Sequence, residues 1–152
     1  MYFKNAIVAL MMLFTSPVLS QIVVDDVGDG WKIKIDSALT LIEKTDPGVY
    51  KEVISNCNHI TYWLGAFSTT QDSSTILIST KDLKLNSINN LACIIVHESH
   101  HLYYKRNRIK MTANKEEYNC YLYEYEFLKK IPNAEDWLTI HVIKCIIKFR
   151  DL

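Results

Sequence analysis

The stretch LACIIVHESHHLYY, residues 91–104, places three histidines and one glutamate within five positions, directly after an apolar run. The segment from Ile88 to about Tyr104 contains no glycine or proline, and its apolar residues recur at helical spacing. This pattern predicts a helix. On that helix His97 and His101 lie one turn apart, so their side chains share a face.

The segments around this helix predict a small sheet and three further helices. Residues 59–65 and 74–80 are rich in β-branched and aromatic side chains and predict two strands, paired antiparallel. Apolar spacing over residues 33–42 predicts an amphipathic helix, closed by a turn at residues 46–48. Two more helices are predicted after the histidine stretch, separated at Pro132.

The predicted fold class is therefore α+β: a small antiparallel sheet with an edge strand packed on the histidine helix, followed by two further helices. A length of 152 residues, with 49% hydrophobic and 22% charged residues, suits one domain with its own core. The formal net charge is 0, and no block of basic residues stands out. Charge therefore gives no reason to expect nucleic acid or an anionic membrane as a partner, and we expect a monomer.

The first twenty residues predict a secretory signal peptide. Lys4 precedes an apolar run from Ala6 to Phe14, and Pro17 and Ser20 follow before Gln21. The alternative is a membrane anchor, but the run is far shorter than the roughly 20 residues that span a bilayer. We therefore predict cleavage after Ser20, a mature domain over residues 21–152, and a secreted or periplasmic protein.

All four cysteines, Cys57, Cys93, Cys120 and Cys145, lie after this segment. An even number in an exported chain suggests disulfides, and four cysteines allow three pairings. The alternative is that they are reduced and buried as small apolar side chains. No pair has CxxC spacing, so we do not expect cysteine to bind a metal.

The histidine stretch contains an HExxH motif formed by His97, Glu98 and His101. Two neutral imidazoles one helical turn apart can share a zinc ion, which binds histidine nitrogen at about 2.0 to 2.1 Å. Glu98 follows the first ligand and is placed to take a proton from a water that the metal activates. His100 could replace His101 as a ligand, although Glu98 would then lose its usual relation to the pair.

Over residues 74–128 the sequence resembles the gluzincin metallopeptidases, the thermolysin-like clan, and especially their smallest single-domain members. The shared features are an edge strand, the HESHH motif, and a glutamate followed three positions later by a small residue. The resemblance implies a zincin-like fold and a third zinc ligand at Glu117, with Cys120 as the small residue, in preference to Glu116. In the thermolysin type an acidic residue follows the small one and supports a histidine ligand, whereas this chain has Tyr121 there.

The resemblance also implies a downstream side chain that stabilises the oxyanion of the tetrahedral intermediate. His141 is the only downstream histidine. Other donors are Tyr103, Tyr104, Tyr121 and Tyr123. Glu124 could support a ligand from outside the metal shell, or it could simply belong to a solvated helix face.

The two ligand helices also suggest a disulfide pairing. Cys93 lies one turn before His97 and Cys120 nearly one turn after Glu117. If the helices run antiparallel across the metal, these cysteines approach each other, which would leave Cys57 with Cys145. The small residue after the glutamate could instead serve only for close packing.

The expected function is an exported zinc-dependent peptidase that acts on a peptide or protein substrate. His97, His101 and Glu117 would hold Zn²⁺, Glu98 would be the general base, and the strand TILIS would pair with an extended substrate. One alternative is a secreted binding protein whose zinc site is structural or vestigial, with a fourth ligand such as His100 or His141. Another is a disulfide-stapled inhibitor or effector that binds no metal.

Overall fold

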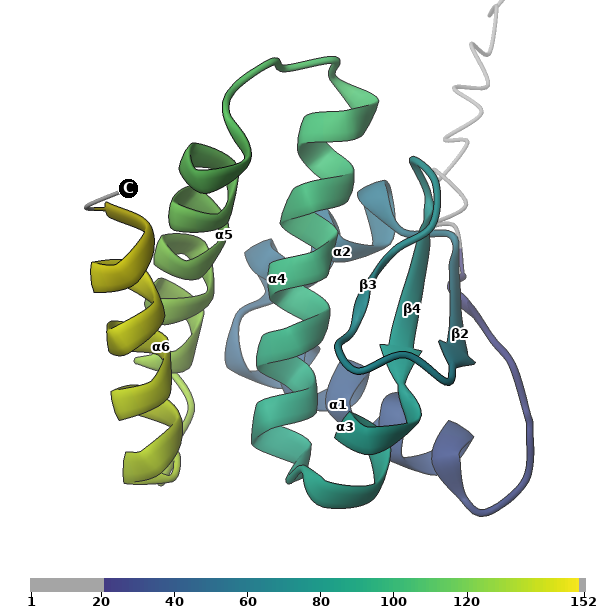
Figure 1. Ribbon diagram of the computed structural model, residues 1–152. Coiled ribbons are helices and arrows are strands. Elements are labelled where there is room, and N and C mark those ends of the chain that lie inside the picture. The colour runs from purple at the N-terminus through teal and green to yellow at the C-terminus, as the bar shows by residue number, and fades with distance from the viewer. Residues whose placement is uncertain (1–20, 151–152) are drawn as a thin grey trace, which may run out of the picture.

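A computed structural model describes residues 21–150 of the chain, which form six helices and a small mixed sheet at one side of the molecule (Figure 1). The α+β class is therefore confirmed. The predicted signal peptide, residues 1–20, lies outside the described residues. Within residues 21–150, no helix has the length and apolar character needed to cross a membrane.

The sheet has four strands in the order β1-β2-β4-β3. Its strands are β1 (Val23–Val24), β2 (His59–Trp63), β3 (Thr69–Thr70) and β4 (Thr75–Ser79). The two predicted strands, β2 and β4, are neighbours, but they pair parallel, so the antiparallel prediction is wrong. The reason is the short strand β3, which lies in the connection between them and pairs antiparallel with β4.

Strand β4 is not the edge of the sheet, contrary to expectation. It lies between β2 and β3, and four of its five residues are buried. Ile76 and Ile78 have no exposed surface. In a strand that is buried on both faces, apolar residues follow one another without alternating with polar ones. This explains the run of three apolar residues in the centre of TILIS. The outer strand on this side is β3.

Two helices connect β1 to β2. Helix α1 spans Trp31–Thr45, and α2 spans Pro47–Asn56, so the turn predicted at residues 46–48 is in fact the start of α2. The Asp46 carboxylate accepts hydrogen bonds from the backbone N–H groups of Gly48 and Val49, at 2.9 and 3.1 Å. An aspartate cap followed by proline is a typical helix start, because proline lacks the N–H that would be unpaired there.

Helix α4 (Ile88–Arg106) is the predicted histidine helix and the centre of the fold. It follows the short helix α3 (Thr80–Leu85), and the Ser87 hydroxyl caps it by accepting from the backbone N–H of Asn90 at 3.2 Å. It contacts α1, α2, α5, β3 and β4. Because other elements surround it, most of its residues are buried.

The last two helices, α5 (Ala113–Leu128) and α6 (Asp136–Arg150), pack side by side. Figure 1 shows α4 between the sheet and this pair. α6 begins at Asp136, after a segment in which Asn133 has a left-handed backbone (φ 56°). Two surfaces of α4 are thus engaged, one by the sheet and one by α5.

Candidate metal centre

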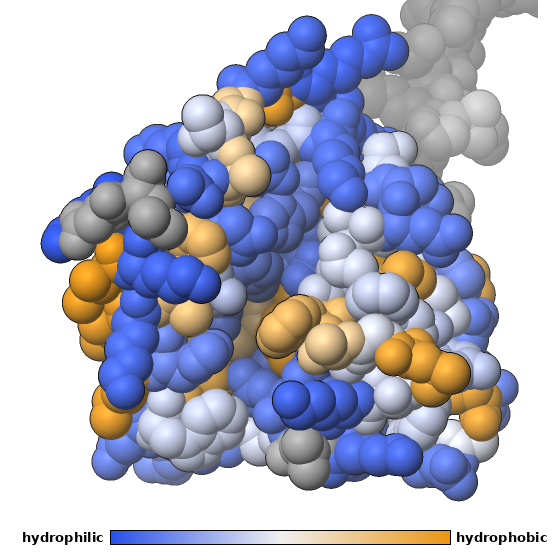
Figure 2. Space-filling view, viewed as in Figure 1, coloured by the Kyte–Doolittle hydropathy of each residue, from blue (hydrophilic) through white to orange (hydrophobic). Residues whose placement is uncertain are grey.

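The HExxH residues lie in a hollow between the sheet side and the α5–α6 side of the molecule. Figure 2 shows this face, which is hollowed between the two sides. The cavity has a volume of about 620 Å³, and its walls come from β3 and the segment before it, α4, α5 and α6. The residues that matter for chemistry are His97, Glu98, His101, Glu116, Glu117 and Tyr121.

Three donor groups converge at one point of this cavity. The Nε2 atoms of His97 and His101 are 3.2 Å apart. One carboxylate oxygen of Glu117 lies 3.5 Å from the first Nε2, and the other lies 3.5 Å from the second. Tetrahedral bonds of about 2.0 to 2.1 Å separate two ligand atoms by about 3.3 Å. The spacing of these donors therefore fits one small cation.

In both His97 and His101, the Nδ1 atom lies within hydrogen-bond distance of a glutamate carboxylate. Glu124 Oε2 lies 3.0 Å from Nδ1 of His97, and Glu116 Oε1 lies 2.7 Å from Nδ1 of His101. When Nδ1 donates to these carboxylates, Nε2 is left as the free lone pair that a metal needs. Glu124 is only 5% exposed, so it does not belong to a solvated face.

The two adjacent glutamates therefore have different positions. Glu116 reaches only the outer nitrogen of His101, whereas Glu117 faces the inner nitrogens of both histidines. Of the two, only Glu117 lies beside both inner nitrogens, and its role as the third ligand stays a prediction.

Cys120 is a fourth donor near the histidines, which the sequence did not lead us to expect. Its Sγ and one nitrogen each of His97 and His101 lie within 4.8 Å of one another, so these three residues could also hold a metal ion. The prediction had relied on CxxC spacing. The signal that was present is the spacing of three from Glu117, which puts the thiol and the carboxylate on neighbouring parts of one helix face.

All four cysteines are free thiols, so neither expected disulfide is formed. Cys57 and Cys93 are buried in the core, and the Cys57 thiol donates to the backbone carbonyl of His59 at 3.3 Å. Cys145 lies on α6, with its sulfur 3.8 Å from Nε2 of His141. The cysteines thus occupy separate environments, as in the alternative of reduced, mostly buried side chains.

The electrostatics of the cluster favour a bound cation. Burial alone would lower the pKa of His97, but its hydrogen bonds to Glu117 and Glu124 outweigh this and raise the pKa to about 10. The hydrogen bond from His97 lowers the pKa of Glu117. Burial raises the pKa of Glu98 to about 7. Burial and the neighbouring His97 lower the pKa of His101. The carboxylates therefore favour positive charge between the two imidazoles, either as a proton on His97 or as a metal ion.

Two further histidines that the sequence offered as ligands, His100 and His141, lie in different places. His100 is not part of the cluster: its ring stacks on Tyr123, with centroids 4.2 Å apart, and its Nε2 lies 3.1 Å from the Tyr104 hydroxyl. His141 lines a second cavity of about 310 Å³, which also borders His97, Glu98 and Tyr121.

The side chains considered as oxyanion donors lie in two different places. His141 and Tyr121 border the HExxH residues. Tyr103, Tyr104 and Tyr123 line a separate pocket with His100. Only the first two therefore remain candidates.

In comparisons with known proteins, no family model, curated protein or solved structure matches this chain.

Proposed function

We propose that the protein is an exported zinc-dependent peptidase of the gluzincin type, with a zincin-like fold. The observation that carries this proposal is the convergence of His97, His101 and Glu117, whose donor atoms lie 3.2 to 3.5 Å apart. Two imidazole nitrogens and a carboxylate are a ligand set of catalytic zinc, with one position left for water or substrate. Two carboxylates that orient the histidines complete the arrangement.

The bound zinc would supply Lewis acidity for the attacking water and the scissile carbonyl. Glu98 follows His97 directly and opens into the same cavities, so it would accept the proton from the water and deliver it to the leaving amine. His141 or Tyr121, which border the same space, would donate a hydrogen bond to the carbonyl oxygen as negative charge develops on it.

The substrate would be an extended peptide or protein segment. Thr69 and Thr70 of the outer strand β3 line the wall opposite α5. A peptide in the cavity could extend the sheet by pairing its backbone with β3, which requires no particular side chains. β3 thus replaces β4 as the proposed docking strand, because β4 already has partners on both sides.

A closed zinc site is the second candidate, and the position of Cys120 favours it. If its thiolate joined His97, His101 and Glu117, four protein ligands would fill the coordination sphere, as in structural sites. Cobalt substitution separates the two candidates. A thiolate-to-cobalt absorption band that is lost in Cys120→Ala would indicate the closed site. A spectrum unchanged by this substitution would indicate an open one.

The test of the proposal is a comparison of the wild type with Glu98→Gln. We expect one zinc per chain in both proteins, and hydrolysis of a casein or peptide-library substrate to be at least about 10²-fold slower in the variant. Glu126→Gln is the matched control, because this glutamate lies on the exposed surface of α5. Full activity in a metal-loaded Glu98→Gln variant would rule out the mechanism.

A further inference from the structure

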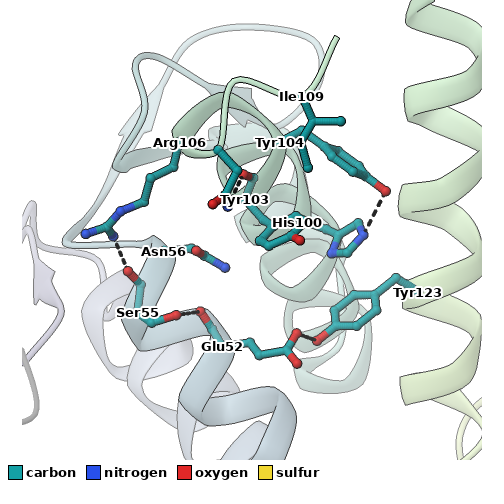
Figure 3. Close-up of a pocket in the computed structure, with 10 residues that line it drawn as sticks. Glu52, Ser55, Asn56, His100, Tyr103, Tyr104, Arg106, Ile109 and Tyr123 are labelled. Carbon is teal, nitrogen blue, oxygen red and sulfur yellow. Dashed lines mark hydrogen bonds between the residues drawn. The ribbon is translucent and has the colours of Figure 1, made fainter. Parts of the chain in front are cut away.

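A second large cavity lies where α2, α4 and α5 meet, apart from the metal ligands. Its volume is about 820 Å³, within the range of small-molecule sites. Figure 3 shows the side chains around it. They include Glu52 and Asn56 from α2, His100 and Arg106 from α4, and Tyr123 from α5.

The Asn56 side-chain amide gives this cavity a polar group on its α2 wall. The residue is only 8% exposed and lines the cavity. In Figure 3 this amide points into the space between the surrounding side chains. A side-chain amide can both donate and accept hydrogen bonds, so a ligand in the cavity that bonds to it gains a specific contact.

The charged groups of the cavity have opposite signs at its two ends. Arg106 lies at one end, where it donates to the backbone carbonyl of Ser55, and Glu52 lies at the other, where it accepts from the Tyr123 hydroxyl (Figure 3). Asn56 lies between them in this view. Each of these contacts uses only part of the bonding capacity of its charged group, since a guanidinium has five N–H donors and a carboxylate has two acceptor oxygens.

Aromatic rings form the wall opposite α2. His100 stacks between Tyr123 and Tyr103, with interplanar angles of 14° and 15°. Ile109 adds an aliphatic surface. A flat apolar group would therefore find a stacking surface beside the polar groups of α2.

We propose that this pocket binds a small zwitterion, namely a free amino acid or a dipeptide with an aromatic side chain. Its carboxylate pairs with Arg106 and its ammonium group pairs with Glu52. The Asn56 amide bonds to the carboxylate of an amino acid or to the peptide group of a dipeptide. Its ring lies against the wall formed by Tyr103, His100 and Tyr123. The site does not depend on the metal centre and holds whether or not the protein is a peptidase.

The experiment is a calorimetric titration of the full chain with L-phenylalanine and, separately, with glycyl-L-phenylalanine. We expect saturable binding of at least one of them, with a Kd below about 1 mM. Phenethylamine, which lacks the carboxylate, and 3-phenylpropionate, which lacks the ammonium group, should each bind at least about tenfold more weakly. Whichever of the two zwitterions has the lower Kd shows whether the pocket prefers a free amino acid or a short peptide.

Two variants locate the site, and one serves as a control. Asn56→Leu and Arg106→Gln should each weaken binding at least about tenfold, and Arg106→Gln should also remove the preference for L-phenylalanine over phenethylamine. Arg108→Gln, a nearby arginine that does not line the cavity, should bind like the wild type. Binding of neither zwitterion, binding of a single-charge analogue as tight as that of L-phenylalanine, or an unchanged Kd in Arg106→Gln would each overturn the proposal.

Discussion

Glu124 and His97 lie on different helices, and the carboxylate oxygen of the first is 3.0 Å from Nδ1 of the second. Both residues are buried, with 5% and 7% of their surface exposed. The contact fixes the imidazole so that its Nε2 faces Glu117. It links α5 to α4 at the point where the proposed metal would bind.

This relationship predicts that Glu124→Gln weakens zinc binding by about 10- to 100-fold, because the imidazole loses the charged partner that orients it and raises its basicity. Competition with a chromophoric chelator measures the change. Glu126→Gln, on the exposed surface of the same helix, should leave the affinity unchanged. Equal affinities of all three proteins would show that Glu124 does not support the metal.

The neighbouring glutamates should differ in their effect on metal binding. Glu117→Ala removes a proposed ligand, so the purified variant should retain little zinc after dialysis. Glu116→Ala removes only the partner of His101 Nδ1, so it should keep its zinc with an affinity lowered by about 10- to 100-fold. Metal analysis of both variants gives the ranking. The reverse ranking would make Glu116 the ligand.

The elements that the sequence predicted are those set by local patterns. The helical spacing of residues 88–104 and the HExxH motif are sufficient to place His97 and His101 on one face. The choice between Glu116 and Glu117 needed the resemblance, since adjacent residues on a helix can both reach toward one neighbour. The structure separates them because α5 brings one to each side of the His101 ring.

The missed features depend on tertiary packing. The parallel pairing of β2 and β4 follows from a two-residue strand, β3, which is too short to show alternation in the sequence. The burial of Glu124 likewise depends on how α5 lies against α4, which residue spacing on α5 alone does not show. The disulfide expectation failed for a similar reason: the number of cysteines says nothing about which of them become neighbours.

The four free thiols should differ in their reactivity toward a thiol reagent, because they differ in burial. Cys57, Cys93 and Cys120 are buried, and desolvation raises the pKa of each thiol, which suppresses the reactive thiolate. Cys145 is partly exposed. In the native protein, only Cys145 should react readily with Ellman's reagent, whereas all four cysteines should react in denaturant. No additional thiol in denaturant after alkylation of the native protein would point to disulfides instead.

The buried side chain of Phe127 should contribute strongly to the stability of the fold. Phe127 on α5 is 1% exposed and is the largest of the fully buried side chains. Phe127→Ala should lower the free energy of unfolding by about 3 to 5 kcal/mol, because the lost apolar surface and the remaining cavity both contribute. Urea denaturation measures the change. Phe67→Ala is the matched control: its ring is 77% exposed, so the expected change is within about 0.5 kcal/mol.

Asp46 makes stability depend on pH. Its hydrogen bond from Lys130, together with those from the backbone N–H groups at the start of α2, holds the pKa of the carboxyl below its usual value of 3.8. A carboxyl whose pKa is lower in the folded state stabilises the fold above the unfolded value, and this stabilisation is lost as the pH falls through the folded value. At pH 7, Asp46→Ala should cost about 0.5 to 2 kcal/mol, as for other N-caps.

The decisive measurement is the difference in unfolding free energy between the wild type and Asp46→Asn as a function of pH. It should be constant from pH 7 to about pH 5 and then shrink below the unfolded pKa, because protonation removes the charge that only the wild type carries. Lys130→Gln removes the ion pair but leaves the cap, since the carboxylate still accepts from Gly48 and Val49. Lys130 is about half exposed, so this variant should lose less stability than Asp46→Ala. An equal loss in both variants would mean that the ion pair, and not the cap, provides the stabilisation.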